Sequence, residues 1–484
     1  MILKTKPFFF FTILFSIILV SACKKDKFLT GDSSLEFSTD TLTFDTVFRY
    51  AGSTTLSFKL YNRDKQPLRI STVRLAGGKS SPFRINLDGI SNVEFSDVEV
   101  PGKDSLFIFV QVNVNPSQSN PLLIKDSVEF VTEGNIKNVK LVAIGQDVYL
   151  HKPDHFPTNG LPAYSIMGKE NTDTILPNDK PHLFFGYTVI DSNCKLTIKG
   201  GTRLYFHNDA VLWVYDKGTL IVKGDYKNEV TFQGDRLESY YKDIPGQWGK
   251  IWFSRGSINN RIDWAIIKNG SIGVQVDTVV TPVAPTVQIT NTIIRNMSGM
   301  AILGQGSRIW GSNCVFANCG RFVAALAIGG SYKFEHCTFA NYWSGSTART
   351  TPLLLLNNYY VSASNQYVIR KLDSAYFGNC ILTGDIEEEI GMDSSVFGGK
   401  FSYKFENCIT KTVRSVSNTT HYKNVYNNAG PDFKNTYEND YHLNASSAAI
   451  NKGYINSLNK DLENKDRPNP AGTFPDLGAY EYYP

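Results

Sequence analysis

A run of closely spaced carboxylates lies near position 390 of the sequence. It contains the carboxylates Asp385, Glu387, Glu388, Glu389 and Asp393. Calcium prefers clustered oxygen ligands, and closely spaced carboxylates are the side chains that supply them. The run is therefore a candidate calcium site, although such a run is also typical of a solvated surface loop. No other cofactor is expected.

A second group of residues could bind a ligand by stacking. Tyr342, Trp343, Tyr359 and Tyr360 flank a leucine run at residues 353–356. Flat aromatic rings suit the faces of sugars, and loops on a rigid scaffold often carry binding residues. These four side chains are candidate ligand-binding residues for a glycan or a protein surface. The alternative is that the rings pack their own loop onto the fold.

The overall composition predicts a β-rich chain and argues against nucleic acid. The 484 residues include 49 basic and 45 acidic side chains, for a net charge of +4. These charges are interleaved and form no basic stripe that would neutralise phosphates, so we expect no nucleic-acid partner. The 25 Tyr and 31 Phe residues, with many Thr, Val and Ile, favour strands. The length indicates about two to four domains.

The N-terminus reads as an export signal that ends at a cysteine. Lys4 and Lys6 precede an apolar run at residues 8–20, which is too short to span a bilayer comfortably. The following Val20-Ser-Ala-Cys23 resembles the lipobox of bacterial lipoproteins. An ordinary secretory signal is the alternative.

The lipobox resemblance implies a signal peptide over residues 1–22, cleavage before Cys23 and acylation of its thiol. Several acyl chains anchor a protein stably to a membrane, whereas one does so marginally. Residues 23–34 would form the lipidated cysteine and a tether, which is similar to those of Bacteroidetes lipoproteins. The expected location is the bacterial outer membrane, facing the periplasm or the cell exterior.

Residues 35–150 show short alternating strands separated by turn residues, as in Leu56-Ser-Phe58-Lys-Leu60. About seven such strands indicate a β-sandwich. The phrases Val112-Asn-Val114-Asn-Pro116 and Val139-Lys-Leu141-Val-Ala-Ile-Gly145 resemble immunoglobulin-like domains of the abnormal-spindle/Hydin type. The resemblance implies a spacer or docking module, which we interpret as a stalk.

Residues 151–164 are predicted to connect two domains, because prolines disfavour regular ladders. His151 and His155 are spaced as zinc ligands on a helix would be. However, Pro153 and Pro157 argue against a helix there.

An internal repeat determines the predicted fold of the remainder. Six segments align, and their fourth positions are 27, 22, 23, 43 and 28 residues apart. The spacing of 43 is either two ordinary periods or one period with a long excursion. The six segments begin at Ile262, Ile289, Gly311, Phe334, Phe377 and Phe405.

Within each segment the inward apolar residues lie at positions 1, 4 and 6, a skip that a straight strand cannot make. The skip falls on position 3, which is Asn in four of the six segments: Asn291, Asn313, Asn379 and Asn407. Asn is the non-glycine residue that best tolerates a left-handed backbone. The pattern therefore predicts strand, Asn corner, strand, which is one coil of a parallel β-helix.

Several further phrases resemble right-handed parallel β-helix proteins of the pectin-lyase-like superfamily. They include Leu196-Thr-Ile198-Lys-Gly-Gly201 and Gly246-Gln-Trp248-Gly249, with Asp476-Leu-Gly478-Ala-Tyr480 as a closing segment. The predicted fold class is all-β: an N-terminal immunoglobulin-like β-sandwich, then a right-handed parallel β-helix with a C-terminal cap over residues 165–484. About a dozen coils at ~4.8 Å each would make a rod ~60 Å long.

Many members of this superfamily cleave acidic polysaccharides, but their motifs are missing. The sequence has no Asp-Asp pair and no Gly-His-Gly, and Arg308-Ile309-Trp310 stands where a cation motif is expected. We therefore predict a non-catalytic, lipid-anchored surface protein that binds a glycan or protein partner. A polysaccharide lyase or hydrolase with a non-standard site, and a purely structural envelope component, remain open alternatives.

Four of the six cysteines beyond Cys23 share position 4 of the repeat: Cys314, Cys337, Cys380 and Cys408. An exported protein with cysteines can form disulfides. An inward column nevertheless suits free cysteine, which behaves as a small hydrophobe. We expect buried thiols and no metal, because paired ligand spacing is missing. Cys194 and Cys319 have no assigned role.

Overall fold

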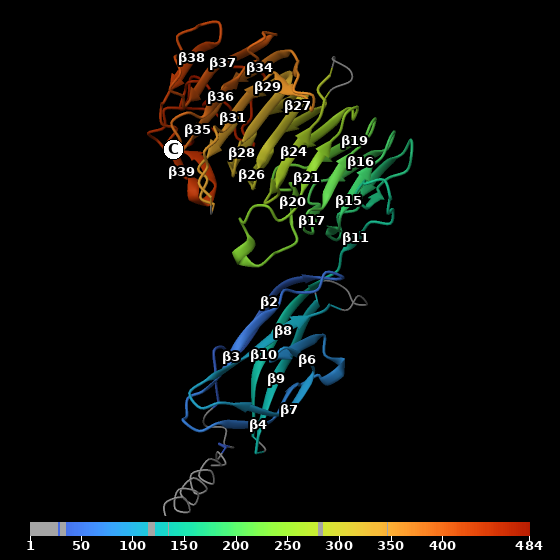
Figure 1. Cartoon of the computed structure of the whole chain (residues 1–484). Helices are drawn as coiled ribbons and strands as arrows, with labels where there is room; N and C mark the ends of the chain where they lie inside the picture. The colour runs from blue at the N-terminus through green and yellow to red at the C-terminus, as the bar shows by residue number, and fades with distance from the viewer. Residues whose placement is uncertain (1–27, 30–34, 115–121, 134, 279–283, 346) are drawn as a thin grey trace, which may run out of the picture. The chain divides into compact units, whose positions relative to one another are not determined.

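The computed structural model describes residues 28–29, 35–114, 122–133, 135–278, 284–345 and 347–484. The chain divides into two units, Met1–Asp147 and Val148–Pro484. The first is an immunoglobulin-like β-sandwich and the second a right-handed parallel β-helix, which confirms the predicted fold class (Figure 1). A search of the described part of the chain finds no helix with the length and apolar character needed to cross a membrane.

The sandwich consists of two five-stranded sheets, more strands than the roughly seven predicted. Alternate residues point inward, so that Phe83, Ile85 and Leu87 of one strand are all buried. One sheet contains, in spatial order, β1 (Leu35–Phe37), β3 (Leu56–Asn62), β8 (Ser105–Val112), β5 (Phe83–Leu87) and β6 (Ile90–Asn92). The other contains β2 (Thr41–Phe48), β10 (Asn135–Gln146), β9 (Leu122–Thr132), β4 (Leu68–Leu75) and β7 (Glu94–Val100).

The solenoid is one 26-stranded sheet in which each strand generally pairs in parallel with the strand one coil further on. It has three faces. The first contains β11 (Tyr149–His151), β14 (His182–Phe184), β17 (Arg203–Phe206), β20 (Val230–Gly234), β23 (Ala265–Lys268), β26 (Ile293–Met297), β28 (Val315–Cys319), β30 (Thr338–Asn341) and β35 (Ile381–Gly384). The second contains β12 (Tyr164–Ile166), β15 (Tyr187–Ile190), β18 (Val211–Val214), β21 (Lys250–Phe253), β24 (Ile272–Val276), β31 (Leu354–Asn357) and β36 (Ile390–Asp393).

The third face carries the repeat. It contains β13 (Asp173–Leu176), β16 (Lys195–Lys199), β19 (Thr219–Lys223), β22 (Asn260–Asp263), β25 (Val287–Thr290), β34 (Leu372–Gly378), β37 (Phe401–Thr410) and β38 (Tyr422–Asn427). Two long strands, β27 (Met300–Ser312) and β29 (Ala324–Glu335), begin on the second face and end on the third. The third face thus has ten rungs, close to the dozen coils expected.

The first coil begins earlier than residue 165. Strand β11 pairs with β14, and β12 pairs with β15, so residues 151–164 lie within the first coil. The spacing of 43 residues is also explained. Thr338 of β30 pairs directly with Ile381 of β35, so the spacing is one coil with a long excursion. That excursion includes a hairpin of β32 (Tyr359–Val361) and β33 (Tyr367–Ile369).

The predicted left-handed corners are present at position 3 of all six segments. Their φ values lie between 49° and 54°, at Trp264, Asn291, Asn313, His336, Asn379 and Asn407. A single left-handed residue turns the chain sharply while the strands on either side keep their inward pattern. The corner prediction is therefore confirmed, including the two segments that lack Asn.

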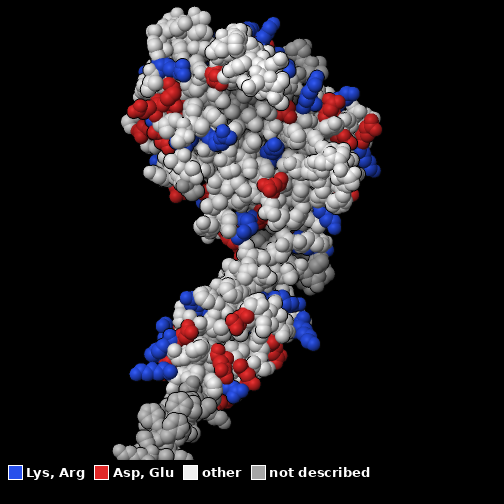
Figure 2. All heavy atoms as spheres, in the orientation of Figure 1, with Lys and Arg blue, Asp and Glu red and all other residues white. Residues whose placement is uncertain are grey.

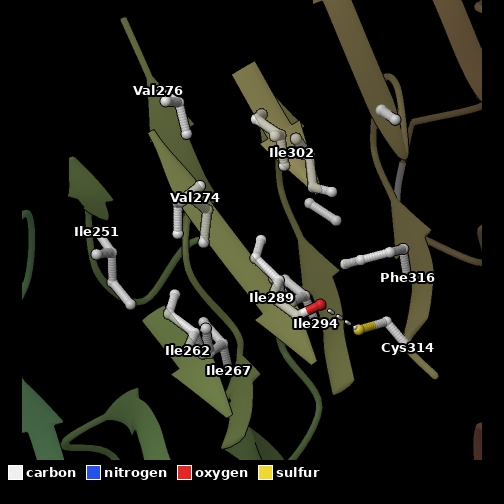
Figure 3. Packing of buried hydrophobic residues seen from close by; sticks show 14 of the residues in the cluster. Ile251, Ile262, Ile267, Val274, Val276, Ile289, Ile294, Ile302, Cys314 and Phe316 are labelled. Carbon is white, nitrogen blue, oxygen red and sulfur yellow. Dashed lines mark hydrogen bonds between the residues drawn. The ribbon is translucent and has the colours of Figure 1, made fainter. Parts of the chain in front are cut away.

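The inward side chains stack from coil to coil into one continuous apolar core. Figure 3 shows part of it, with isoleucines and valines of neighbouring coils beside Cys314 and Phe316. The Cys314 thiol donates to the carbonyl oxygen of Ile289 in the preceding coil, at 3.4 Å. All six described cysteines are free and buried, which confirms the expectation for the four in the column.

We predict that these six thiols resist alkylation in the native protein. Burial raises the pKa of Cys319 to about 12 and also raises that of Cys314 and Cys380. Burial would raise the pKa of Cys337 too, but hydrogen bonds from Cys314 and Cys380 outweigh it and lower that pKa to about 5. All six side chains are buried, so an alkylating reagent cannot reach them in the folded protein. Mass spectrometry after iodoacetamide treatment should show labelling only when denaturant is present, without any reductant. A disulfide between two column cysteines would contradict this prediction.

The C-terminal segment, residues 428–484, folds back along the Asn corners. The side-chain amides of Asn407, Asn379 and Asn313 donate to the carbonyl oxygens of Lys452, Tyr454 and Lys460, each at 2.8 Å. The segment therefore runs antiparallel to the direction in which the coils progress. It contains two short paired strands, β39 (Phe433–Asn435) and β40 (Asp440–Leu443).

Candidate functional site

The expected lipid attachment residue, Cys23, lies outside the described residues. Its role therefore stays a prediction. The remaining candidate residues all lie on the solenoid, where their positions can be compared.

The five carboxylates of the acidic run do not converge on one point. Glu389 is fully buried, whereas Glu387 is exposed. Asp393 accepts hydrogen bonds from Tyr359 and Asn357, and Glu388 accepts one from Thr412. No group of three or more potential metal ligands occurs among the described residues. The hypothesis of a calcium site in this run is therefore wrong, because the carboxylates point to different partners.

Glu389 instead belongs to a buried ion pair. Its two oxygens accept from Nη1 and Nη2 of Arg349, at 2.8 and 2.6 Å, and Asp385 contacts the same guanidinium. Burial alone would lower the pKa of Arg349, but the two carboxylates outweigh it and raise the pKa. The pair fastens the loop that follows β30 to the neighbouring coil.

Tyr359 and Tyr360 lie apart from the other two candidate aromatics, in the β32–β33 hairpin. The Tyr359 hydroxyl donates to Asp393 at 3.0 Å, and its ring stacks on Tyr367 with centroids 5.3 Å apart. Tyr360 is partly exposed. Tyr359 thus helps to pack the hairpin, which is the alternative that the sequence left open.

Tyr342 and Trp343, in contrast, line a surface cavity of about 170 Å³. The cavity gathers segments that are distant in sequence: the loop after β20, two corners of the first face, the loop after β30 and the C-terminal segment. Three aromatic rings, several amides and one carboxylate meet there. The residues involved are Asp243, Asn296, Asn318, Tyr342, Trp343, Tyr437 and Asn439, together with Ile244, Pro245, Ser344, Gly345 and Thr436.

Hydrogen bonds hold the cavity walls in place. The Trp343 indole N–H donates to the Thr347 carbonyl oxygen at 2.9 Å, which fixes the ring within its loop. The side-chain oxygen of Asn318 accepts from the backbone N–H of Tyr342 at 3.1 Å. The amide of Asn318 donates to Asn439 at 2.7 Å, joining the C-terminal segment to the same corner.

Hydrogen bonds also fix Asp243, the carboxylate that lines the cavity. Asp243 accepts hydrogen bonds from Arg295 at 2.7 Å and Asn296 at 2.9 Å, both on the same carboxylate oxygen. The second oxygen of Asp243 can therefore accept from a ligand hydroxyl. Tyr437, which also lines the cavity, is 90% exposed, so its ring is accessible for stacking.

Sequence reasoning missed five of these residues: Asp243, Asn296, Asn318, Tyr437 and Asn439. Asn296 and Asn318 belong to a second column of left-handed corners, with φ values of 56° and 51°. This column was visible as a recurring Asn at position 8 of the repeat. Asp243 and Tyr437 carried no signal, because their loops have no periodicity and meet the corners only through tertiary folding.

Acidic and basic side chains are interspersed over the visible surface (Figure 2). Local arrangement, more than net charge, therefore determines where a charged ligand could bind.

Comparisons with known proteins identify no family. No protein-family model and no curated protein match the chain. Among solved structures, the chain is similar to the catalytic unit of a GH87 α-1,3-glucanase from Streptomyces thermodiastaticus, at 9% identity and TM-score 0.25. That match covers 77% of this chain and 89% of the glucanase unit.

Two further matches are shorter. One is a PapD-like domain of human CEP192, at 12% identity and TM-score 0.17, covering 26% of this chain and 96% of that domain. The other is the Vibrio cholerae protease VesB, at 14% identity and TM-score 0.16, covering 23% of this chain and 32% of the protease. TM-scores this low carry no argument about function.

Proposed function

We propose that this chain is a lipid-anchored envelope protein of the Bacteroidetes type whose solenoid binds a glycan without cleaving it. The observation that carries this proposal is the cavity in which Trp343 and Tyr437 meet amide side chains and the carboxylate of Asp243. Aromatic rings stack on sugar faces, while amides and a carboxylate bond to sugar hydroxyls. At about 170 Å³ the cavity suits a single sugar residue better than a chain.

The chemistry of the cavity favours binding over cleavage. Most glycoside hydrolases use two carboxyl groups, one on each side of the scissile bond. Among the described residues that line this cavity, Asp243 supplies the one carboxylate.

The test is a glycan array probed with the detergent-solubilised full chain. We expect binding to a subset of oligosaccharides, and the same oligosaccharides should remain intact after prolonged incubation. Release of new reducing ends or of unsaturated sugars would contradict the non-catalytic proposal.

The anchor makes a separate prediction. Cys23→Ser should shift the protein out of the membrane fraction or leave it unprocessed, because the hydroxyl cannot replace the thiol as acyl acceptor. Fractionation of cells, followed by mass measurement of the N-terminal peptide, checks this. Normal processing with unchanged membrane association would exclude lipidation at Cys23.

A further inference from the structure

One sheet of the sandwich, in the order β1-β3-β8-β5-β6, carries aromatic side chains on its outer face. Phe107 and Phe109 of β8 are 44% and 41% exposed, and their rings stack with centroids 5.9 Å apart. Tyr61 of β3 is partly exposed on the same face, because it alternates with buried residues of its strand. Exposed apolar patches of this kind mark surfaces that bind a partner or a membrane.

The charges on this face are mostly positive. Within its five strands the charged residues are Lys59, Arg84 and Glu36. Glu36 lies 2.8 Å from Arg63, which neutralises it. The ammonium nitrogen of Lys59 lies 4.5 Å from the centre of the Phe107 ring, and Arg84 donates to two backbone carbonyl oxygens. Two positive charges on the face are therefore left without a carboxylate partner.

The outer face of the other sheet, which contains β2, β10, β9, β4 and β7, has a different character. Arginines on it are paired with carboxylates: Arg69 lies 3.0 Å from Asp97, and Arg74 lies 3.0 Å from Glu129. The sandwich thus has one aromatic face with unpaired cations and one face on which such charges are paired.

The tether between Cys23 and the sandwich is short. Leu29 is held on the sandwich, because its backbone N–H donates to the carbonyl oxygen of Pro67 at 2.8 Å. Phe28, the preceding residue, is five positions from Cys23, so their Cα atoms are at most about 18 Å apart. An acylated Cys23 would therefore hold this end of the sandwich at the membrane surface.

The aromatic patch lies toward the same end. The backbone N–H of Lys103, two residues before β8, donates to the carbonyl oxygen of Asp64 at 2.7 Å. Asp64 and Pro67 belong to the one loop that joins β3 to β4. Phe107 follows Lys103 by four residues, which is about 14 Å of extended chain. The patch is therefore within reach of the membrane to which the tether leads.

We propose that the outer face of this sheet lies on an anionic phospholipid surface, with the Phe107 and Phe109 rings at the level of the headgroups. Aromatic rings are enriched at the membrane interface, and cations such as Lys59 are attracted to anionic headgroups. The inference rests on the proposed lipid anchor and deepens it: the lipid holds the chain on the membrane, and the sheet face orients the sandwich there.

The test uses residues 23–484 carrying Cys23→Ser, so that no lipid contributes to binding. We expect this protein to sediment with vesicles made of equal parts phosphatidylethanolamine and phosphatidylglycerol, less with added salt, and weakly with phosphatidylcholine vesicles. Phe107→Ser/Phe109→Ser should weaken binding at least about tenfold, because two apolar side chains no longer enter the interface. Lys59→Glu should weaken it several-fold.

The control is Leu123→Ser/Ile144→Ser. These two residues are 54% and 41% exposed and lie directly opposite each other on the other sheet. The control should bind vesicles as the parent protein does. Equal losses in the two double variants would overturn the proposal, and so would absence of binding to the anionic vesicles. Self-association that needs Phe107 and Phe109, without vesicle binding, would instead assign the face to a second copy of the chain.

The outcome is independent of acylation, because the test protein lacks the thiol of Cys23. Cell fractionation of the Cys23→Ser variant tests the anchor itself. Failure of vesicle binding together with normal lipidation would refute the membrane-facing sheet and leave the anchor in place.

Discussion

Replacing Arg349 with Met is expected to lower the free energy of unfolding by about 3 to 5 kcal/mol, because it leaves a buried carboxylate without its partner. The Arg349 side chain is 1% exposed and Glu389 is fully buried. Glu389 would keep its hydrogen bonds from the backbone N–H groups of Leu353 and Ile386 but lose both contacts with the guanidinium. Denaturant unfolding followed by circular dichroism measures the change.

Two further variants separate the buried pair from charge removal in general. Arg414→Met removes an exposed arginine that lies 3.6 Å from Glu388, and should cost less than about 1 kcal/mol. The double variant Arg349→Met/Glu389→Leu should recover much of the lost stability, because both charges are then gone. A loss below about 1 kcal/mol for Arg349→Met alone would mean that the pair does not fasten the loop.

Asn379→Val is expected to produce the second large effect, a loss of about 2 to 4 kcal/mol. A β-branched residue is strained at φ 54°, and the valine also leaves buried backbone groups of Tyr454 without their partner. Asn379→Gly relieves the strain but still loses these hydrogen bonds. It should cost about 1 to 2 kcal/mol, more than a corner residue with no such contact.

Asn424 is the matched control. It holds a corner of φ 51° in the last rung, is exposed, and donates only to the Asn407 side chain at 3.3 Å among the contacts of the described residues. Asn424→Gly should therefore be nearly neutral. Equal unfolding midpoints for Asn379→Val and Asn379→Gly would show that the left-handed corner carries no strain.

The coil could be predicted from sequence because its geometry repeats. Position 3 of each segment has a left-handed backbone, which is unfavourable for most side chains and tolerated by Asn. Asn stands there in four of the six segments, so the pattern is visible in the sequence alone. The side chains of the Asn corners bond to one another only in part. Asn313 does donate to Asn291 at 3.2 Å, but Asn313, Asn379 and Asn407 also bond to the C-terminal segment.

A closing segment was expected at the C-terminus, but its path along the corners could not be predicted. It meets the corners across sequence separations of 45 to 147 residues, and its own sequence has no repeat. It also lines two surface cavities, of about 600 and 280 Å³, which were therefore equally hidden in the sequence.

The sequence grouped the four aromatic candidates together, but the structure separates them into two pairs. All four were selected because they flank one excursion from the solenoid. Tyr342 and Trp343 lie at its start, beside the corner of Asn318, whereas Tyr359 and Tyr360 lie in a hairpin further along. The sequence shows that these aromatic residues belong to one excursion from the solenoid. Which rings come together depends on the direction in which the chain leaves the coil.

The most direct test of glycan binding is calorimetric titration of the full chain with the strongest oligosaccharide found on the array. Trp343→Ala and Tyr437→Ala should each weaken binding at least about tenfold, since each removes one stacking ring. Tyr360→Ala, which removes an exposed ring outside the cavity, should leave the affinity unchanged. Undiminished binding by both cavity variants, or an equal loss in Tyr360→Ala, would contradict the assignment of the cavity as the glycan site.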